Sequence, residues 1–184
     1  MFNIKTMNAI AEKGLDELKA ENCAVSPEMS APDALLIRSA KLHDAVFNKE
    51  LLCIGRAGIG VDNIPIERCS EAGIAVFSTP GANANAVKEL VLAALLLTSR
   101  KIVPAIEWAQ ALKGTADISK QVEKGKSAFA GPEILGKKLG VIGLGAIGVK
   151  VANTAIHLGM DVYGYDPYIS VDAAWNLSRE IHHI

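Results

Sequence analysis

Short, continuously apolar runs alternate with segments of helical spacing over the first hundred residues. Runs of four such residues, at 34–37, 51–54 and 74–77, are typical of strands buried on both faces, as in a parallel sheet. We predict strands over residues 2–7, 34–37, 51–54 and 74–77. The segments between them predict helices from a cap at Asn8, over 41–49 and over 65–72. Strand and helix in repetition indicate a doubly wound α/β domain.

A long apolar segment follows, and its pattern predicts a helix from Asn83 to about residue 102. The segment is apolar nearly all round, so we expect the helix to be buried between domains or against a partner subunit. Pro104 is expected to kink or restart the helix, which continues to about Leu112. Residues 113–136 are polar and contain several glycines, which is typical of a surface linker.

The segment from residue 138 to 166 has the pattern of a dinucleotide-binding βαβ unit. A strand over 138–142 runs into Gly143-Leu144-Gly145-Ala146-Ile147-Gly148, a helix follows to Gly159, and a second strand ends at Asp166. A GxGxxG run alone could be a simple glycine turn. With strand, helix and acid in register, the pattern predicts binding of a dinucleotide.

Each position of this motif has a physical role. Gly143 permits a tight turn, Gly145 lets a pyrophosphate approach the backbone, and Gly148 lets the helix pack close to the strand. The free N–H groups of the helix N-terminus favour an anion. Asp166 is placed to accept hydrogen bonds from ribose hydroxyls and would repel a ribose phosphate, which favours NAD over NADP.

Polar residues directly follow the predicted strands of the first domain. They are Arg38 and Ser39, then Arg56 and Gly58, then Ser78 and Thr79. Open α/β sheets bind ligands at the carboxyl ends of their strands, and a guanidinium fork matches both carboxylate and phosphate. Either arginine alone is equally consistent with a solvated surface residue. Two arginines at neighbouring strand ends favour a small acid that carries both a carboxylate and a phosphate as the ligand.

Composition narrows the classes of partner. Nineteen basic and 20 acidic residues give a net charge of −1, which argues against nucleic acid or an anionic membrane as partner. Three cysteines without metal-ligand spacing favour reduced thiols, and no segment resembles a signal peptide or membrane span. We therefore expect a cytoplasmic protein without a metal. No histidine has an identifiable carboxylate partner, so none is assigned as acid or base.

Three blocks of sequence resemble the D-isomer-specific 2-hydroxyacid dehydrogenase family. They are LLIRSA, IGRAGIGVDNIPIERCSEAGIAVFSTPGANANAVKELVLAALLL and GKKLGVIGLGAIGVKVANTAIHLGMDVYGYDPYIS, in the family's order. The resemblance implies a flavodoxin-like substrate domain over residues 1–98, a Rossmann NAD-binding domain from 99 to 184, and a cleft between them. It is nearest to members that oxidise 3-phosphoglycerate to 3-phosphohydroxypyruvate with NAD in serine biosynthesis.

The resemblance also implies roles for single residues. Arg38 and Ser39 match the family's phosphate-binding pair, and Arg56, Gly58 and Ile59 match the loop that meets the substrate and the nicotinamide end of the cofactor. Gly143, Gly145, Ala146, Ile147 and Gly148 match the pyrophosphate turn, and Asp166 matches the ribose acid. Many members have a small polar residue in place of Ile59 and an arginine in place of Ala146. The family usually forms homodimers through its NAD domain, with the long helix nearby.

The family's catalytic arginine, glutamate and histidine match no residue of this sequence. Only 18 residues follow Asp166, with one short helix expected over 173–181, whereas a Rossmann domain needs further parallel strands. We therefore expect a fragment with an incomplete NAD domain, inactive by itself. Two alternatives remain: an NAD(H)-binding sensor or corepressor, and a dehydrogenase of another D-2-hydroxy acid.

Overall fold

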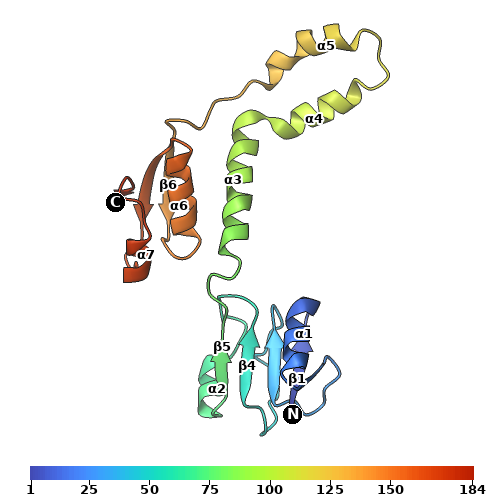
Figure 1. The fold of residues 1–184 in the computed structure, drawn as a ribbon, viewed down its shortest axis with the longest axis vertical. Helices are drawn as coiled ribbons and strands as arrows, with labels where there is room; N and C mark the ends of the chain where they lie inside the picture. The colour runs from blue at the N-terminus through green and yellow to red at the C-terminus, as the bar shows by residue number, and fades with distance from the viewer. The chain divides into compact units, whose positions relative to one another are not determined.

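The computed structural model describes residues 1–184, and all of its sheet pairing is parallel (Figure 1). The chain divides into two compact units, Met1–Ala82 and Asn83–Ile184. A five-stranded sheet of order β2-β1-β3-β4-β5 forms the first unit, and a three-stranded sheet of order β6-β7-β8 lies in the second. The predicted α/β class with parallel sheets is confirmed. The sequence placed the domain boundary after residue 98, whereas the units divide before the long helix.

The elements of the first unit are β1 (Phe2–Met7), α1 (Glu12–Ala20), β2 (Cys23–Ser26), β3 (Ala34–Ile37), β4 (Cys53–Arg56), α2 (Ile66–Glu71) and β5 (Ala75–Phe77). The strands β1 and β3 have the predicted bounds, and β4 begins two residues later than expected. The prediction missed β2, a half-buried edge strand of four residues that has no marked alternation of apolar and polar positions.

The core of this unit lies on one face of the sheet. Ile37 and Ile54 are fully buried, and the register pairs Leu35 with Ile54, so neighbouring strands project apolar side chains to the same side. The same cluster contains residues from the segments after β3 and β4 and from α2: Leu42, Leu51, Ile64, Cys69 and Ile74.

Two local predictions for this unit are wrong. Residues 41–49 form turns and loop, not a helix, because the guanidinium of Arg68 donates hydrogen bonds to the carbonyls of Leu42, His43 and Ala45 and fixes an irregular path. The first helix is not capped by Asn8. Its N-cap is Ala11, and Asn8 lies in the left-handed region at φ 78° with its side chain bonded elsewhere.

The elements of the second unit are α3 (Ala84–Arg100), α4 (Ile102–Ala111), α5 (Ile118–Gly125), the 3-10 helix η1 (Lys126–Phe129), β6 (Lys138–Ile142), α6 (Gly148–His157), β7 (Asp161–Tyr165), α7 (Val171–Trp175) and β8 (His182–His183). Its core joins α6 to one face of the sheet through Leu144, Ala152, Ala155 and Val162. The helix α3 packs on α6. None of the helices is long and apolar enough to cross a membrane.

Several expectations for this unit are corrected. The long helix breaks at Lys101, at φ 48°, and Pro104 lies in the first turn of α4, where a missing N–H is tolerated. Within the single chain the helix is not buried, since Leu90 is 72% and Leu97 42% exposed, so its expected burial against a partner subunit stays a prediction. The predicted helix over 173–181 is shorter, and the residues after it form β8.

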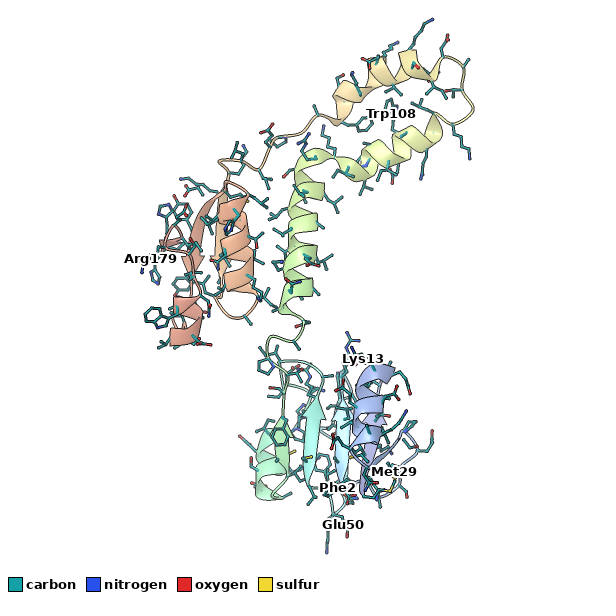
Figure 2. All side chains as sticks on the ribbon, in the orientation of Figure 1. Phe2, Lys13, Met29, Glu50, Trp108 and Arg179 are labelled. Atoms are coloured by element: carbon teal, nitrogen blue, oxygen red, sulfur yellow. The ribbon has the colours of Figure 1, made fainter.

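The expected linker over 113–136 is also wrong, because it contains α5 and η1. Trp108 of α4 packs on Phe129 of η1, with ring centroids 5.0 Å apart, and a Cβ at Gly125 would collide with the indole (Figure 2). This aromatic pair holds a polar segment against α4.

The core of the first unit yields a stability prediction. We expect Ile54→Ala to lower the free energy of unfolding of that unit by about 2–5 kcal/mol, because it leaves a cavity at a fully buried site. Val46→Ala, at a position 96% exposed, is the control and should change it by less than about 0.5 kcal/mol. Both tryptophans, Trp108 and Trp175, lie in the second unit, so the measurement is amide hydrogen exchange of β4. Equal effects of the two changes would contradict the assigned core.

Candidate functional site

Parallel pairing brings the predicted polar residues of the first unit to one edge of its sheet. The segments after β3, β4 and β5 are joined there by backbone hydrogen bonds. Ala57 N–H donates to the Ile37 carbonyl at 2.8 Å, and Thr79 N–H donates to the Gly58 carbonyl at 3.0 Å. Arg38, Ser39, Arg56 and Gly58 thus form one group, as the sequence predicted.

Arg56 lies across this edge. Its Nε donates to the Arg38 carbonyl at 3.0 Å, and its Nη1 lies 3.7 Å from Oδ1 of Asp62. The Arg56 side chain is 19% exposed, whereas that of Asp62 is 89% exposed, so the ion pair itself is largely solvated. A Cβ at Gly60 would lie 2.8 Å from Nη1, so a larger residue there would displace the end of the Arg56 side chain. The remaining guanidinium N–H groups have no protein acceptor and are available to a ligand.

The sequence analysis missed one residue of this edge, Asn8. Its Oδ1 accepts hydrogen bonds from three successive backbone N–H groups, those of Arg38, Ser39 and Ala40, at 3.2, 2.9 and 2.8 Å. The available signal was an asparagine directly after the strand β1, because asparagine tolerates the left-handed conformation that a sharp departure from a strand requires. Asn8 therefore shapes the loop, while Arg38 and Ser39 remain exposed.

The glycine run of the second unit forms a tight loop between β6 and α6. Gly143 has φ 90°, and a Cβ at Gly148 would collide with the Gly143 carbonyl oxygen. A Cβ at Gly145 would meet no atom within 4 Å. Gly143 and Gly148 are thus required by the fold of the loop, whereas Gly145 faces open space.

The backbone of this loop presents free donors. The N–H groups of Gly145, Ala146 and Ile147 donate to no protein acceptor, and α6 has no side-chain cap at its N-terminus. Unpaired N–H groups at a helix N-terminus are the arrangement that binds phosphate groups. The residues present therefore fit a pyrophosphate.

Asp166 is bonded to the same loop. Its Oδ2 accepts from Leu144 N–H at 2.8 Å and its Oδ1 from Tyr168 N–H at 2.9 Å. An ionised carboxylate has about four lone-pair sites, so each oxygen can accept a further hydrogen bond from a ligand hydroxyl. Ile59, expected near the cofactor, lies in the first unit after β4, and its side chain is 63% exposed.

The expectation that no histidine has a carboxylate partner is wrong. His182 Nε2 lies 2.9 Å from Oδ1 of Asp161, and the Tyr163 hydroxyl donates to Oδ2 of the same carboxylate at 3.0 Å. Asp161 begins β7, so this group occupies the amino edge of the sheet, opposite to Gly143 and Asp166. The sequence analysis missed the pair because it did not predict the strand β8, which places His182 beside Tyr163.

The three cysteines are free thiols. Burial raises the pKa of Cys53, and it also raises that of Cys69 against an opposing effect from Arg68. Both therefore stay protonated at neutral pH, which disfavours a nucleophilic role. No group of three or more histidine, cysteine, aspartate or glutamate side chains is placed to hold a metal ion.

Residues 6–180 match the sequence model of the family described as D-isomer specific 2-hydroxyacid dehydrogenase, catalytic domain. The chain belongs to this family. Among relatives, it is 41% identical over 152 residues to D-3-phosphoglycerate dehydrogenase of Methanocaldococcus jannaschii, with 81% of this chain and 27% of that protein aligned. It is 40% identical over 152 residues to hydroxypyruvate reductase of Thermotoga maritima, with 81% and 45% aligned. The chain thus spans less than half the length of these dehydrogenases.

Two solved structures agree with the fold. The NAD⁺-bound 3-phosphoglycerate dehydrogenase of Entamoeba histolytica is 25% identical with a TM-score of 0.66, and the alignment covers 97% of this chain and 57% of that one. The TT0316 protein of Thermus thermophilus has a TM-score of 0.75 at 24% identity, covering 92% and 57%. These comparisons confirm the resemblance and the fold class.

The second and third glycines of the run, Gly145 and Gly148, make a matched pair for a test. We expect Gly148→Ala to destabilise the second unit by about 1–3 kcal/mol, because its Cβ would displace the Gly143 carbonyl. Gly145→Ala should leave stability unchanged within about 1 kcal/mol, because its Cβ meets open space. Amide hydrogen exchange across β6 and α6 measures both. A Gly145→Ala change as damaging as Gly148→Ala would contradict the loop geometry.

Proposed function

We propose that this dehydrogenase oxidises 3-phosphoglycerate to 3-phosphohydroxypyruvate with NAD as hydride acceptor, as a step of serine biosynthesis. The observation that carries the proposal is the pair of arginines at one sheet edge, with Arg56 Nε bonded to the Arg38 carbonyl at 3.0 Å. A substrate with a carboxylate and a phosphate offers two anionic groups to such a pair. Relatives named as D-3-phosphoglycerate dehydrogenases at 34–41% identity support the choice of substrate.

In the proposed complex, the exposed Arg38 and Ser39 bind the phosphate. Their backbone is fixed by Asn8 and Arg56, so their side chains are free to meet a ligand. Arg56 is held partly buried and offers its unpaired N–H groups to a second anionic group. Gly58 keeps the surface beside Arg56 clear of a side chain.

In the second unit, the N–H groups of Gly145, Ala146 and Ile147 hold the pyrophosphate of NAD, with no charged side chain among them. Asp166 accepts from the ribose hydroxyls with its remaining lone pairs, and its charge disfavours a ribose phosphate. When bound, NAD supplies the nicotinamide ring that takes the hydride from C2 of the substrate. The hydroxyl proton goes to a base.

We assign none of the four histidines as the base at either proposed site. His43 bonds through Nε2 to the Asp62 carbonyl, and the His182–Asp161 pair lies at the amino edge of its sheet. We therefore propose that these residues alone do not catalyse turnover, since a general base contributes about 10²–10⁴-fold. The free thiols Cys23, Cys53 and Cys69 support a cytoplasmic site of action.

We further propose that the protein is a homodimer, with α3 and α4 at the contact. Large apolar side chains are exposed on these two helices: Leu90, Leu96, Leu97, Ile102, Val103 and Ile106. Several large apolar side chains exposed on two consecutive helices are typical of a subunit interface. Light scattering at micromolar concentration is expected to give twice the mass of one chain, and a monomer would contradict this.

The activity is tested with protein expressed from its complete reading frame, beside the 184-residue chain. We expect the former to oxidise NADH with 3-phosphohydroxypyruvate and the latter to show no turnover. Arg38→Ala should raise KM for 3-phosphohydroxypyruvate by about 10–100-fold, because a charged hydrogen-bond partner of the phosphate is lost. KM for unphosphorylated hydroxypyruvate should change little.

Lys49→Ala is the matched control, because it removes one positive charge before β4, at the other edge of the sheet. An equal rise in KM for both acids would refute phosphate binding by Arg38 and favour a hydroxypyruvate reductase, as the Thermotoga relative is named. NADH binding without turnover of either acid would refute the enzymatic proposal and favour a sensor.

A further inference from the structure

We propose that Asn8 is a positioning residue for the loop of residues 38–40, named the anion-binding loop below. Its side-chain oxygen fills a concavity formed by backbone N–H groups, called a nest, that an anionic ligand would otherwise occupy. The inference rests on the proposed function of Arg38 and Ser39. It begins from one oxygen atom, Asn8 Oδ1, on which the N–H groups of three consecutive residues converge at 3.2, 2.9 and 2.8 Å.

Consecutive N–H groups that converge on one point form a concavity of positive partial charge, which commonly binds an anion. Here the occupant belongs to the chain and is neutral. A ligand's phosphate therefore does not enter the nest, and it meets the side chains of Arg38 and Ser39 from outside. The loop keeps the shape of an anion-bound nest without using a ligand to hold it.

The position of Asn8 follows from the strand that precedes it. Met7 ends β1 and is paired with Ile37, the last residue of β3, so the next residues of both strands emerge side by side. The left-handed backbone of Asn8, at φ 78°, turns the chain away at this point and leaves the amide oxygen at the end of β3.

Two other side chains complete the support of the loop backbone. Arg56 Nε donates to the Arg38 carbonyl at 3.0 Å, and Asn63 Nδ2 donates to the Ala40 carbonyl at 2.7 Å. Asn63 is 7% exposed, so this anchor belongs to the core. The backbone N–H and carbonyl groups of the loop are thus bonded by side chains from three different segments. Because the loop is already ordered before a ligand binds, binding costs less conformational entropy.

Two substitutions distinguish the effect of the Asn8 side-chain oxygen from the effect of the left-handed backbone conformation. Asn8→Gly keeps access to positive φ and removes the acceptor, whereas Asn8→Asp keeps an acceptor of nearly the same shape. The experiment records ¹H–¹⁵N spectra and amide exchange of the 184-residue chain, and then titrates it with 3-phosphoglycerate and, separately, with inorganic phosphate.

We expect Asn8→Gly to remove the exchange protection of the amides of Arg38, Ser39 and Ala40 and to weaken 3-phosphoglycerate binding about tenfold. Inorganic phosphate should shift these amides further in Asn8→Gly than in the unaltered chain, because the vacated nest is open to it. Asn8→Asp should keep the amide protection of the unaltered chain, because it keeps the acceptor, whereas its added negative charge should lower the affinity for a phosphate. Protection that is kept in Asn8→Asp and lost in Asn8→Gly identifies the side-chain oxygen as the group that holds the loop.

The proposal is overturned if the three amides keep their protection in Asn8→Gly, or if Asn8→Asp loses protection to the same extent as Asn8→Gly. The amide readout needs no ligand. If the unaltered chain does not bind 3-phosphoglycerate, the proposed function fails, while the exchange data still decide whether Asn8 holds the loop.

Discussion

Parallel strand pairing is the constraint on which both candidate sites depend. In the first unit the register places Ile37 beside Arg56, so the loop after β3 and the arginine that ends β4 are neighbours although 18 residues separate Arg38 from Arg56. In the second unit Ile142 pairs with Tyr165, which puts Gly143 beside Asp166. Antiparallel pairing would send the same residues to opposite edges, and neither group of polar atoms would form.

The two units offer an anion different hydrogen-bond donors, side chains in the first unit and backbone N–H groups in the second. In the first, the loop backbone is already bonded by Asn8, Arg56 and Asn63, and only side chains remain for a ligand. In the second, the loop between Gly143 and Gly148 keeps its backbone N–H groups free and presents no polar side chain. A guanidinium fork discriminates ligands by charge and shape, whereas unpaired backbone N–H groups bind phosphate groups. The difference is consistent with the substrate and the cofactor that we propose.

The sequence predicted those parts of the fold that local patterns encode. The strands β1 and β3, and the glycine loop with its flanking elements, depend on apolar runs and on glycines at fixed spacing. It did not predict the path of residues 41–49, because Arg68 imposes that path through bonds to carbonyls 23–26 residues away. Asn8 was misassigned as a helix cap for the same reason, since its partners lie 30–32 residues along the chain. Long-range hydrogen bonds of this kind leave no periodicity.

The long-range anchors also explain why the irregular part of the first unit can support a site. The segment after the anion-binding loop has no helix, yet Leu42 is 1% exposed and Arg68 packs over Phe47 with its guanidinium carbon 4.7 Å from the ring centroid. His43 is bonded to the Asp62 carbonyl, and Leu42 N–H to that of Asn63, so the segments after β3 and β4 form one bonded layer. A loop within such a layer resists displacement when a charged ligand binds, and the exposed Arg38 side chain is the part left free to respond.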